Sequence, residues 1–306
     1  MNFLKVILLP AFLFSLFALA SCTPDESSES STTVYAESVQ DSTQRVQAVT
    51  GFDGPEAVRY DPEQDLYFVA NFTGGGNDRD STGFISKLNT DGTLESLRFL
   101  TGTEEYPMHA PRGMFILGET LWAADADGIH GFNRTTGEQT DFIDFTTLNP
   151  GFLNDIAASA DGTLYVTDTG TNTLYRVDGS TPVVVTSELP HAPNGITLHP
   201  ETGVLVLAPW GGALTYHAWD PDEETLTVYA SGQGGGNIDG IEFFQGKLLA
   251  ASQRDSSLHI IDGQQDLVYI TMPGRPADIG LDTQRNQVAV PYIALNRVDI
   301  WQLPEE

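Results

Sequence analysis

Cysteine is almost missing from this chain, since Cys22 is the only one among 306 residues. One cysteine cannot form an intramolecular disulfide, and it rules out cysteine-rich structural zinc sites. Lysine occurs only at positions 5, 87 and 247, and the chain has 14 Lys and Arg against 42 Asp and Glu. The formal net charge of −28 repels nucleic acids and anionic lipids, so we expect no nucleic-acid partner. This acidity fits either a protein from a salty habitat or a soluble extracytoplasmic protein.

Common enzyme motifs are missing too. No serine elbow (G-x-S-x-G), Walker lysine loop or dinucleotide-binding G-x-G-x-x-G follows a predicted strand. From Gly51 onward there is no long amphipathic helical pattern, only short β-rich runs divided by Gly, Pro, Asn and Asp. These absences leave an all-β protein whose chemistry, if it has any, must come from another kind of site.

Residues 1–21 are predicted to be a lipoprotein signal peptide. One cation, Lys5, precedes an apolar run from Val6 to Ala20, which is shorter than the roughly 20 residues of a permanent transmembrane helix. The segment Leu19-Ala20-Ser21-Cys22 resembles the bacterial lipobox, in which the cysteine is acylated and becomes the first mature residue. The alternative is an ordinary signal peptide followed by a free thiol, which would be a liability in an oxidising compartment.

Residues 22–43 are predicted to be an acidic, Ser/Thr-rich tether, because they contain too few large apolar residues to order themselves. Asp25 and Glu26 lie close to the cysteine, as in some lipoproteins that reach the outer face of the outer membrane. We therefore expect a cell-envelope protein, lipid-anchored to the outer membrane and facing either the periplasm or the surface. Its contact with the membrane would be through the lipid alone.

Residues 44–306 are predicted to form a six-bladed β-propeller. Similar segments open six units, at Gly54-Pro55-Glu56, Ala110-Pro111-Arg112, Leu153-Asn154, Pro193-Asn194, Ile238-Asp239 and Ala277-Asp278. The steps between their last residues are 56, 42, 40, 45 and 39, and the long first step contains the loop Gly74 to Asp80. Four short strands at a period near 40 are typical of propeller blades.

The last unit has only three predicted strands, Ala277 to Leu281, Gln287 to Pro291 and Arg297 to Leu303. A closed ring needs a fourth strand there, since an unpaired edge would be exposed. The segment Arg45 to Thr50 alternates as a strand should, and it precedes the first unit. We therefore expect this N-terminal strand to complete the last blade.

The opening residues of the blades should converge on the propeller axis. Two carboxylates, Glu56 and Asp239, and two amides, Asn154 and Asn194, offer only oxygen ligands there. Oxygen donors with about two negative charges suit Ca²⁺, although another divalent metal is an option, whereas Zn²⁺ would favour His or Cys. The alternative is that these side chains only cap tight turns through hydrogen bonds to the backbone.

From Gly51 to Leu303 the sequence resembles the senescence-marker-protein/gluconolactonase (SMP-30/gluconolactonase/LRE-like) superfamily. The resemblance is carried by Gly54-Pro55-Glu56-Ala57-Val58, Asn154-Asp155, Pro193-Asn194-Gly195-Ile196 and Ile238-Asp239-Gly240-Ile241. It implies that Glu56, Asn154, Asn194 and Asp239 surround a catalytic divalent metal. Two departures concern sugar lactones: Phe152 replaces a substrate-binding arginine, and the tryptophan usual after the first-blade Glu is missing.

The main hypothesis is a Ca²⁺-dependent hydrolase of lactone or ester type that acts, as a monomer, on a small molecule. Asp239 would be the base or nucleophile. Arg112 and His109, from the opening of the second blade, would contact an anionic substrate. The alternative hypothesis is a non-catalytic envelope propeller, with structural calcium, that binds a ligand or a protein partner.

Overall fold

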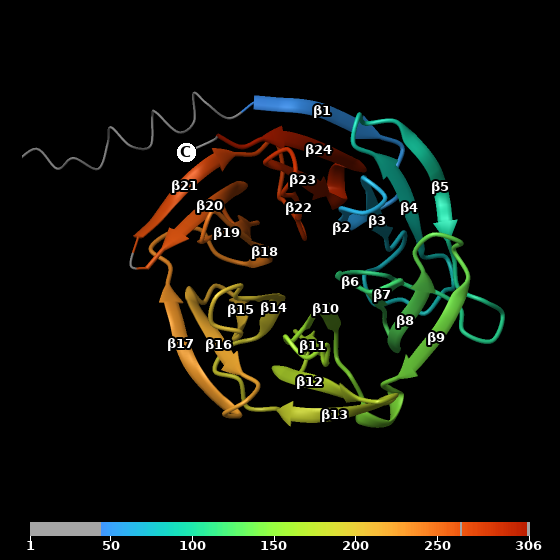
Figure 1. The fold of residues 1–306 in the computed structure, drawn as a ribbon, viewed down its shortest axis with the longest axis horizontal. Helices are drawn as coiled ribbons and strands as arrows, with labels where there is room; N and C mark the ends of the chain where they lie inside the picture. The colour runs from blue at the N-terminus through green and yellow to red at the C-terminus, as the bar shows by residue number, and fades with distance from the viewer. Residues whose placement is uncertain (1–43, 264, 305–306) are drawn as a thin grey trace, which may run out of the picture.

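The computed structural model describes residues 44–263 and 265–304. In this part of the chain, 24 strands form six antiparallel four-stranded sheets around a central axis (Figure 1). The predicted six-bladed propeller is therefore confirmed. The predicted signal peptide, the tether and Cys22 lie outside the described residues and stay predictions. No helix among the described residues is long and apolar enough to cross a bilayer.

Each blade runs from an innermost strand at the axis to an outermost strand at the rim. Blades 1 and 2 contain β2 (Pro55–Asp61), β3 (Leu66–Asn71), β4 (Phe84–Asn89), β5 (Leu94–Leu100), β6 (Met114–Leu117), β7 (Thr120–Ala124), β8 (Gly128–Asn133) and β9 (Gln139–Asp144). Blades 3 and 4 contain β10 (Leu153–Ala158), β11 (Leu164–Asp168), β12 (Thr173–Asp178), β13 (Thr181–Thr186), β14 (Pro193–Leu198), β15 (Leu205–Pro209), β16 (Thr215–Asp220) and β17 (Thr225–Ser231). Blades 5 and 6 contain β18 (Ile238–Phe244), β19 (Lys247–Ser252), β20 (Ser257–Asp262), β21 (Gln265–Thr271), β22 (Gly280–Asp282), β23 (Gln287–Tyr292), β24 (Arg297–Gln302) and β1 (Gln44–Thr50).

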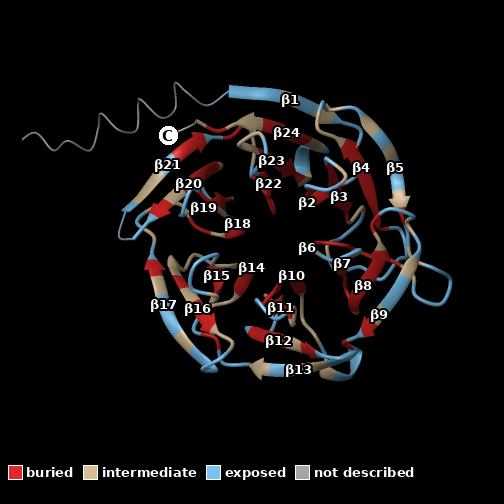
Figure 2. Ribbon diagram, viewed as in Figure 1, coloured by how far each residue is buried: buried red, intermediate tan, exposed pale blue. Residues whose placement is uncertain are grey.

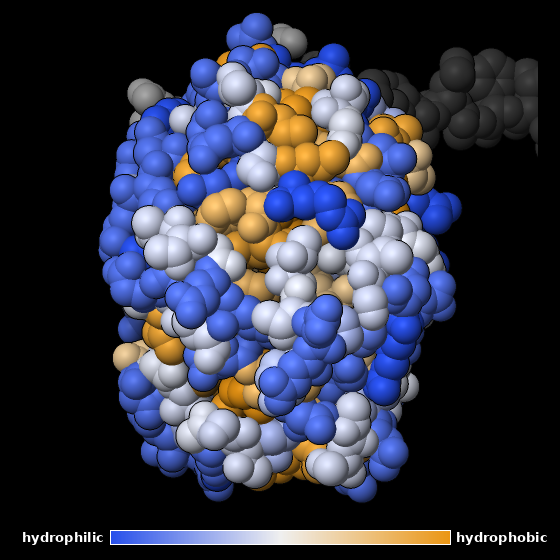
Figure 3. Space-filling view, turned by 90° about the vertical axis from the view of Figure 1, so that its right-hand side faces the viewer, coloured by the Kyte–Doolittle hydropathy of each residue, from blue (hydrophilic) through white to orange (hydrophobic). Residues whose placement is uncertain are grey.

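Burial decreases from the axis to the rim, and the residue pattern of each strand follows it (Figure 2). Inner strands such as β3 and β10 are buried along their whole length, and apart from Asn71, Asn154 and Asp155 their residues are hydrophobic. Outer strands such as β5 and β17 alternate between half-buried and exposed residues, which is the pattern of a sheet with one wet face. The side of the ring over β5 and β9 is largely hydrophilic, with separate hydrophobic patches (Figure 3).

The core is a ring of hydrophobic clusters between neighbouring blades. Among the described residues there are six such clusters, and each draws its members from two adjacent blades. Phe68 and Met114, for example, join blades 1 and 2. The cluster between blades 6 and 1 contains Val298 and Tyr67. Since every blade depends on both of its neighbours, the ring is stabilised only when it is complete.

The N-terminal strand closes the ring, as predicted. Strand β1 pairs antiparallel with β24 along its length, from Gln44 opposite Gln302 to Thr50 opposite Arg297. Arg45 Nη1 also lies 3.4 Å from Asp299 Oδ2, whose side chain is fully buried. The last blade therefore takes its outermost strand from one end of the described chain and its other three from the opposite end.

One predicted strand starts later than expected. The sequence predicts a strand from Ala277, whereas β22 begins at Gly280. The reason is that Asp278 pairs with the neighbouring blade: its backbone N–H donates to the carbonyl of Glu56 (2.9 Å), and its carbonyl accepts from Val58 N (3.1 Å). This contact places Asp278 directly beside one of the predicted metal ligands.

Candidate metal centre

The four predicted metal ligands occupy equivalent places in the ring. Glu56, Asn154, Asn194 and Asp239 are each the second residue of an innermost strand, in blades 1, 3, 4 and 5. In all four strands the pairing register slips at this point, which is the geometry of a β-bulge. A bulge turns the side chain away from the regular alternation of the sheet, so it can point to the axis. All four side chains belong to residues that are only 3–5% exposed.

Several oxygens at the axis are buried without any hydrogen-bond partner. They are Glu56 Oε2, Asn194 Oδ1, Asp239 Oδ1 and Asp278 Oδ2. A buried polar atom without a partner costs about 1–3 kcal/mol, so each of these four oxygens calls for a partner that the protein does not supply. If these side chains merely capped turns, their oxygens would accept backbone N–H groups, and these four do not. A hard divalent cation such as Ca²⁺ fits this set of oxygens.

The electrostatics of the group also favour a cation. Burial, together with the nearby Asp239 carboxylate, raises the pKa of Glu56 well above its usual value. Burial also raises the pKa of Asp239 to about 7, although a hydrogen bond from Gln253 Nε2 to Asp239 Oδ2 (2.5 Å) opposes this shift. A divalent ion would reverse both shifts, because it stabilises the ionised carboxylates.

Two further acidic groups lie close to these ligands: Asp278, which the sequence placed among the opening residues but not among the ligands, and Asp155, which it did not identify. Asp155 accepts hydrogen bonds from Ile156 N (2.7 Å) and from Ile196 N of the next blade (2.8 Å), so it joins blades 3 and 4. Asp278 carries one of the unpartnered oxygens. Gly113 makes room for Asp155, since a Cβ there would lie 2.1 Å from Asp155 Oδ1. In the sequence, the signal for these two carboxylates was the glycine that follows an opening residue: a Cβ at Gly113 would meet Asp155, and one at Gly240 would meet Asp278.

Arg112, predicted to contact substrate, is fully buried in the structure. Its Nη1 donates to Leu153 O (2.6 Å) and its Nη2 to Asn77 Oδ1 (3.2 Å), while the guanidinium lies 3.8 Å from the ring centre of Phe152. Phe152 stands where the resemblance would place a substrate-binding arginine, and here it supports a cation from the neighbouring blade instead. Contact between Arg112 and a substrate stays a prediction.

His109, the other predicted substrate contact, lies in the loop before β6 and is 6% exposed. Its Nδ1 accepts a hydrogen bond from Ser81 N (3.0 Å), and its Nε2 lies 3.4 Å from Asp127 Oδ2. Both ring nitrogens thus have partners in the loops of blades 1 and 2. The substrate-binding role of His109 also stays a prediction.

An ion pair joins blades 1 and 5 deeper along the axis. Arg59 Nη1 lies 2.5 Å from Glu242 Oε1, and Arg59 Nε donates to Met114 O (2.7 Å). Arg59 follows the predicted ligand Glu56 by three positions in β2. Glu242 follows Asp239 by three positions in β18. Three residues of a strand cover roughly 10 Å, so the pair lies about that far below the ligands. The half-buried Arg59 also lowers the pKa of Asp155 and of Asp278, against the effect of burial.

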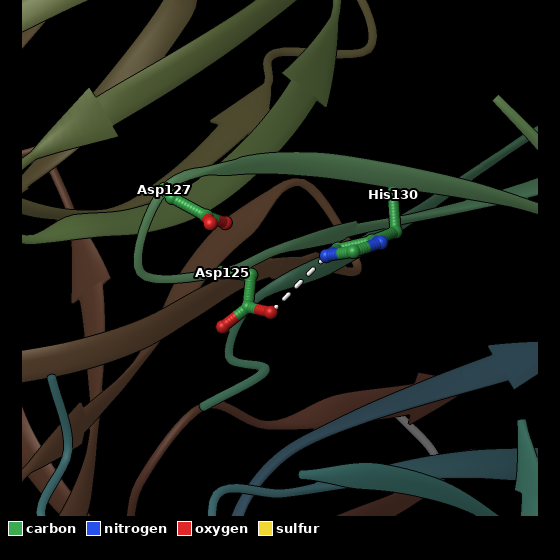
Figure 4. A group of neighbouring side chains, drawn as sticks. All are labelled: Asp125, Asp127 and His130. Atoms are coloured by element: carbon green, nitrogen blue, oxygen red, sulfur yellow. Dashed lines mark hydrogen bonds and ion pairs between the residues drawn. The ribbon is translucent and has the colours of Figure 1, made fainter. Parts of the chain in front are cut away.

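A second group with metal-ligand chemistry consists of Asp125, Asp127 and His130 in blade 2 (Figure 4). Its ligand atoms lie within 4.8 Å of one another, close enough to hold one ion. However, Asp125 already accepts from the backbone N–H groups of residues 109, 110 and 126. His130 Nε2 lies 3.1 Å from Asp125 Oδ2, and Gln139 Nε2 donates to His130 Nδ1 (2.9 Å). A metal here would have to break this network, so the axial group is the better candidate.

Comparison with known proteins agrees with the architecture. Residues 54–277 match the family model described as SMP-30/Gluconolactonase/LRE-like region. None of the curated proteins compared with the sequence matches it.

Solved structures with the same fold include a gluconolactonase of Xanthomonas campestris, with 17% identity, a TM-score of 0.64, and coverage of 85% of this chain and 91% of that one. A virginiamycin B lyase of Staphylococcus aureus has 13% identity, a TM-score of 0.60, and coverage of 86% and 100%. At these identities the likeness shows the fold alone.

Proposed function

Because the chain belongs to the SMP-30/gluconolactonase/LRE-like family, we propose that it is a metal-dependent hydrolase of lactones or esters. The observation that supports this most directly is that Glu56, Asn194 and Asp239, each the second residue of an innermost strand, carry buried oxygens without a hydrogen-bond partner. Glu56, Asn154, Asn194 and Asp239 would hold the ion, with calcium as the first candidate because all the donors are oxygens. When bound, such an ion polarises a carbonyl oxygen and stabilises the charge that develops on it.

Asp239 is the residue best placed for the chemistry. Gln253 holds its Oδ2 through a hydrogen bond of 2.5 Å, while Oδ1 has no partner within the protein. In the proposed reaction, Oδ2 would face the ion, and Oδ1 would take a proton from a water molecule as that water attacks the carbonyl carbon. The bond to the leaving oxygen then breaks, and the proton passes to that oxygen. Direct attack by Oδ1 on the carbonyl carbon is the second route, followed by hydrolysis of the acyl-enzyme.

Calcium is expected to raise the melting temperature of the protein, because a ligand that binds only the folded state stabilises it. The gain is roughly 2.7 kcal/mol at a hundredfold excess over Kd. Glu56→Gln should strongly weaken the shift, since it removes one of the charges at the axis. Glu201→Gln, an exposed carboxylate in the loop between β14 and β15, is the matched control and should behave as wild type. An equal calcium shift in wild type and Glu56→Gln would remove the axial site and the enzyme proposal with it.

The non-catalytic alternative makes a different prediction in the same experiments. A calcium shift that depends on Glu56, combined with no turnover on a panel of lactones, esters and organophosphates, would favour a binding propeller with structural calcium. Turnover that disappears with a chelator and returns with calcium would favour the hydrolase. The substrate panel thus separates the two functions, and the thermal shift tests the metal that both assume.

We also propose that the protein works in the cell envelope, anchored by lipid on Cys22. The support is the lipobox-like sequence Leu19-Ala20-Ser21-Cys22 after a short apolar run. Cys22→Ser should release the protein from membranes into the soluble fraction, because the acylated residue is lost. Mass spectrometry of the mature N-terminus checks the modification. An unmodified terminus at another residue would contradict the proposal.

A further inference from the structure

One register position in the third strand of blades 1 to 5 is filled by a side chain that faces the end of the second strand. It is occupied by Ser86, His130, Tyr175, His217 and His259, which pair with Val69, Ala123, Val166, Leu207 and Ala250. In blades 1, 2 and 3 this side chain binds the polar residue that ends or follows the second strand, namely Asn71, Asp125 and Asp168. The position is therefore normally part of a polar clamp within the blade.

Two of the three histidines at this position have both ring nitrogens occupied. His130 is held between Asp125 and Gln139, as described above. In blade 5, His259 Nδ1 lies 2.6 Å from Asp266 Oδ1, and its Nε2 lies 2.9 Å from Asp255 Oδ2. Neither imidazole is available to a further ligand without breaking an ion pair or a hydrogen bond.

Blade 4 is different because its second strand ends in Pro209. This residue pairs with Pro193, just as Asn71 pairs with Pro55 and Asp168 with Leu153. Proline has no side-chain acceptor, so His217 lacks the usual polar side-chain partner, and its ring instead hydrogen-bonds the backbone of Thr215. The ring of His217 also faces that of His191, with 5.7 Å between the ring centres and 53° between the planes.

The two rings border a cavity the size of one ligand atom. Its volume is about 10 Å³, and it is lined by residues that include His191, Pro193, Thr215 and His217. A cavity of roughly 10–15 Å³ is the minimum for one water molecule, so the space suits a single water or ion. Burial, together with the neighbouring His191, lowers the pKa of His217, which favours the neutral imidazole that metals bind.

We propose that His191 and His217 form a second metal site, for a divalent transition ion such as Cu²⁺, Ni²⁺ or Zn²⁺. Imidazole nitrogens bind a metal at about 2.0–2.1 Å, which puts the centres of two rings on one ion roughly 5–6 Å apart. The observed separation is 5.7 Å. Thr215 also lines the cavity. Nitrogen donors select these ions over calcium, so the site is chemically distinct from the axial oxygens.

An ion at this site would influence the position of the predicted axial ligand Asn194, because His191 precedes Asn194 by only three residues. An ion bound by His191 on the loop and His217 on β16 would fix that loop to its own blade. The proposal does not depend on the hydrolase activity, since it rests only on blade 4.

The test is Cu²⁺ titration of the full chain carrying Cys22→Ser, which removes the only thiol, with calcium present to fill the axial site. We expect one equivalent of Cu²⁺ to bind, with an electron paramagnetic resonance spectrum of two nitrogen ligands. His191→Ala and His217→Ala should each lower the affinity at least tenfold and remove one nitrogen from the spectrum. His217→Gln serves in the same way if His217→Ala fails to fold.

Two controls make the result specific. His199→Ala should leave Cu²⁺ binding unchanged, because that ring packs against Phe243 and its Nδ1 accepts from Glu201 N. Asp239→Asn should impair the calcium response and leave Cu²⁺ binding intact. Copper affinity that is the same in wild type, His191→Ala and His217→Ala would overturn the proposal. Loss of copper binding in Asp239→Asn would equally overturn it, since the ion would then sit at the axis.

Discussion

Asp239→Asn is expected to lower kcat by at least about 100-fold, even at calcium concentrations that fill the site, since general-base catalysis contributes roughly 10²–10⁴-fold. The amide can neither take a proton from water nor attack a carbonyl, whereas its size matches the carboxylate. The residue is 3% exposed and accepts a hydrogen bond from Gln253, so the substitution preserves its surroundings. The measurement is steady-state hydrolysis of the best substrate from the panel over a calcium titration.

The calcium titration separates two effects of the same substitution. Loss of one negative charge should raise the calcium concentration needed for half-saturation, and excess calcium corrects that defect. The loss of kcat should remain at saturation if Asp239 takes part in the chemistry. Asp222→Asn, at an exposed loop position, is the matched control. Full recovery of kcat at high calcium would show that Asp239 is only a metal ligand.

Deletion of residues 44–50 together with the segment before them is expected to destabilise the whole ring, whereas deletion of 23–43 should have little effect. Without β1, the backbone groups of β24 that pair with it along the whole strand lose their partners. At about 1 kcal/mol net for each hydrogen bond, the loss is on the order of 5 kcal/mol, a large share of the 5–15 kcal/mol that stabilises a typical domain.

Thermal unfolding of the two truncations followed by circular dichroism gives the measurement. Most of β1 is exposed or half-buried, so the effect should come from backbone pairing and from the ion pair of Arg45 with Asp299 rather than from apolar burial. Equal melting temperatures for the two truncations would mean that the last blade is stable with three strands.

The architecture was readable from the sequence because propeller blades are local in the chain. Each blade is built from hairpins within about 40 residues, so its turns and apolar runs appear as a repeat. The missing strand was predictable by the same count: three strands at the end of the chain and a spare one at Arg45 to Thr50. The bounds predicted for the strands of the last blade agree to within one residue except at the start of β22, which begins three residues late because Asp278 pairs with Glu56 and Val58 of the next blade. Contacts between blades leave no periodic signal.

The candidate site was only partly predictable for the same reason. The ligand positions follow from the repeat, since each of Glu56, Asn154, Asn194 and Asp239 opens a blade. The ion pair between Arg59 and Glu242 joins residues 183 positions apart, and no local sequence pattern predicts it. Arg112 appeared to be free for a substrate because its contacts with Asn77 and Leu153 come from other blades.

The partners of the histidines could not be predicted from the sequence either. His217 and His259 occupy the same register position, and the sequence around them does not reveal that one is held by two carboxylates. The difference arises from Asp255 and Asp266 in blade 5 and from Pro209 in blade 4. It becomes visible only when the blades are superposed through their strand pairing.

The closure of the last blade also sets the order in which the chain can fold. Arg45 and its partner Asp299 are 254 positions apart, so β1 is synthesised long before the strand that receives it. At about 5–20 residues per second, the delay is on the order of 10 to 50 s. During that time the finished blades can form only an open arc, with unpaired strand edges at risk of wrong association. A chain that stops before β24 leaves β1 without a partner, so the ring cannot close until the last strand has been synthesised.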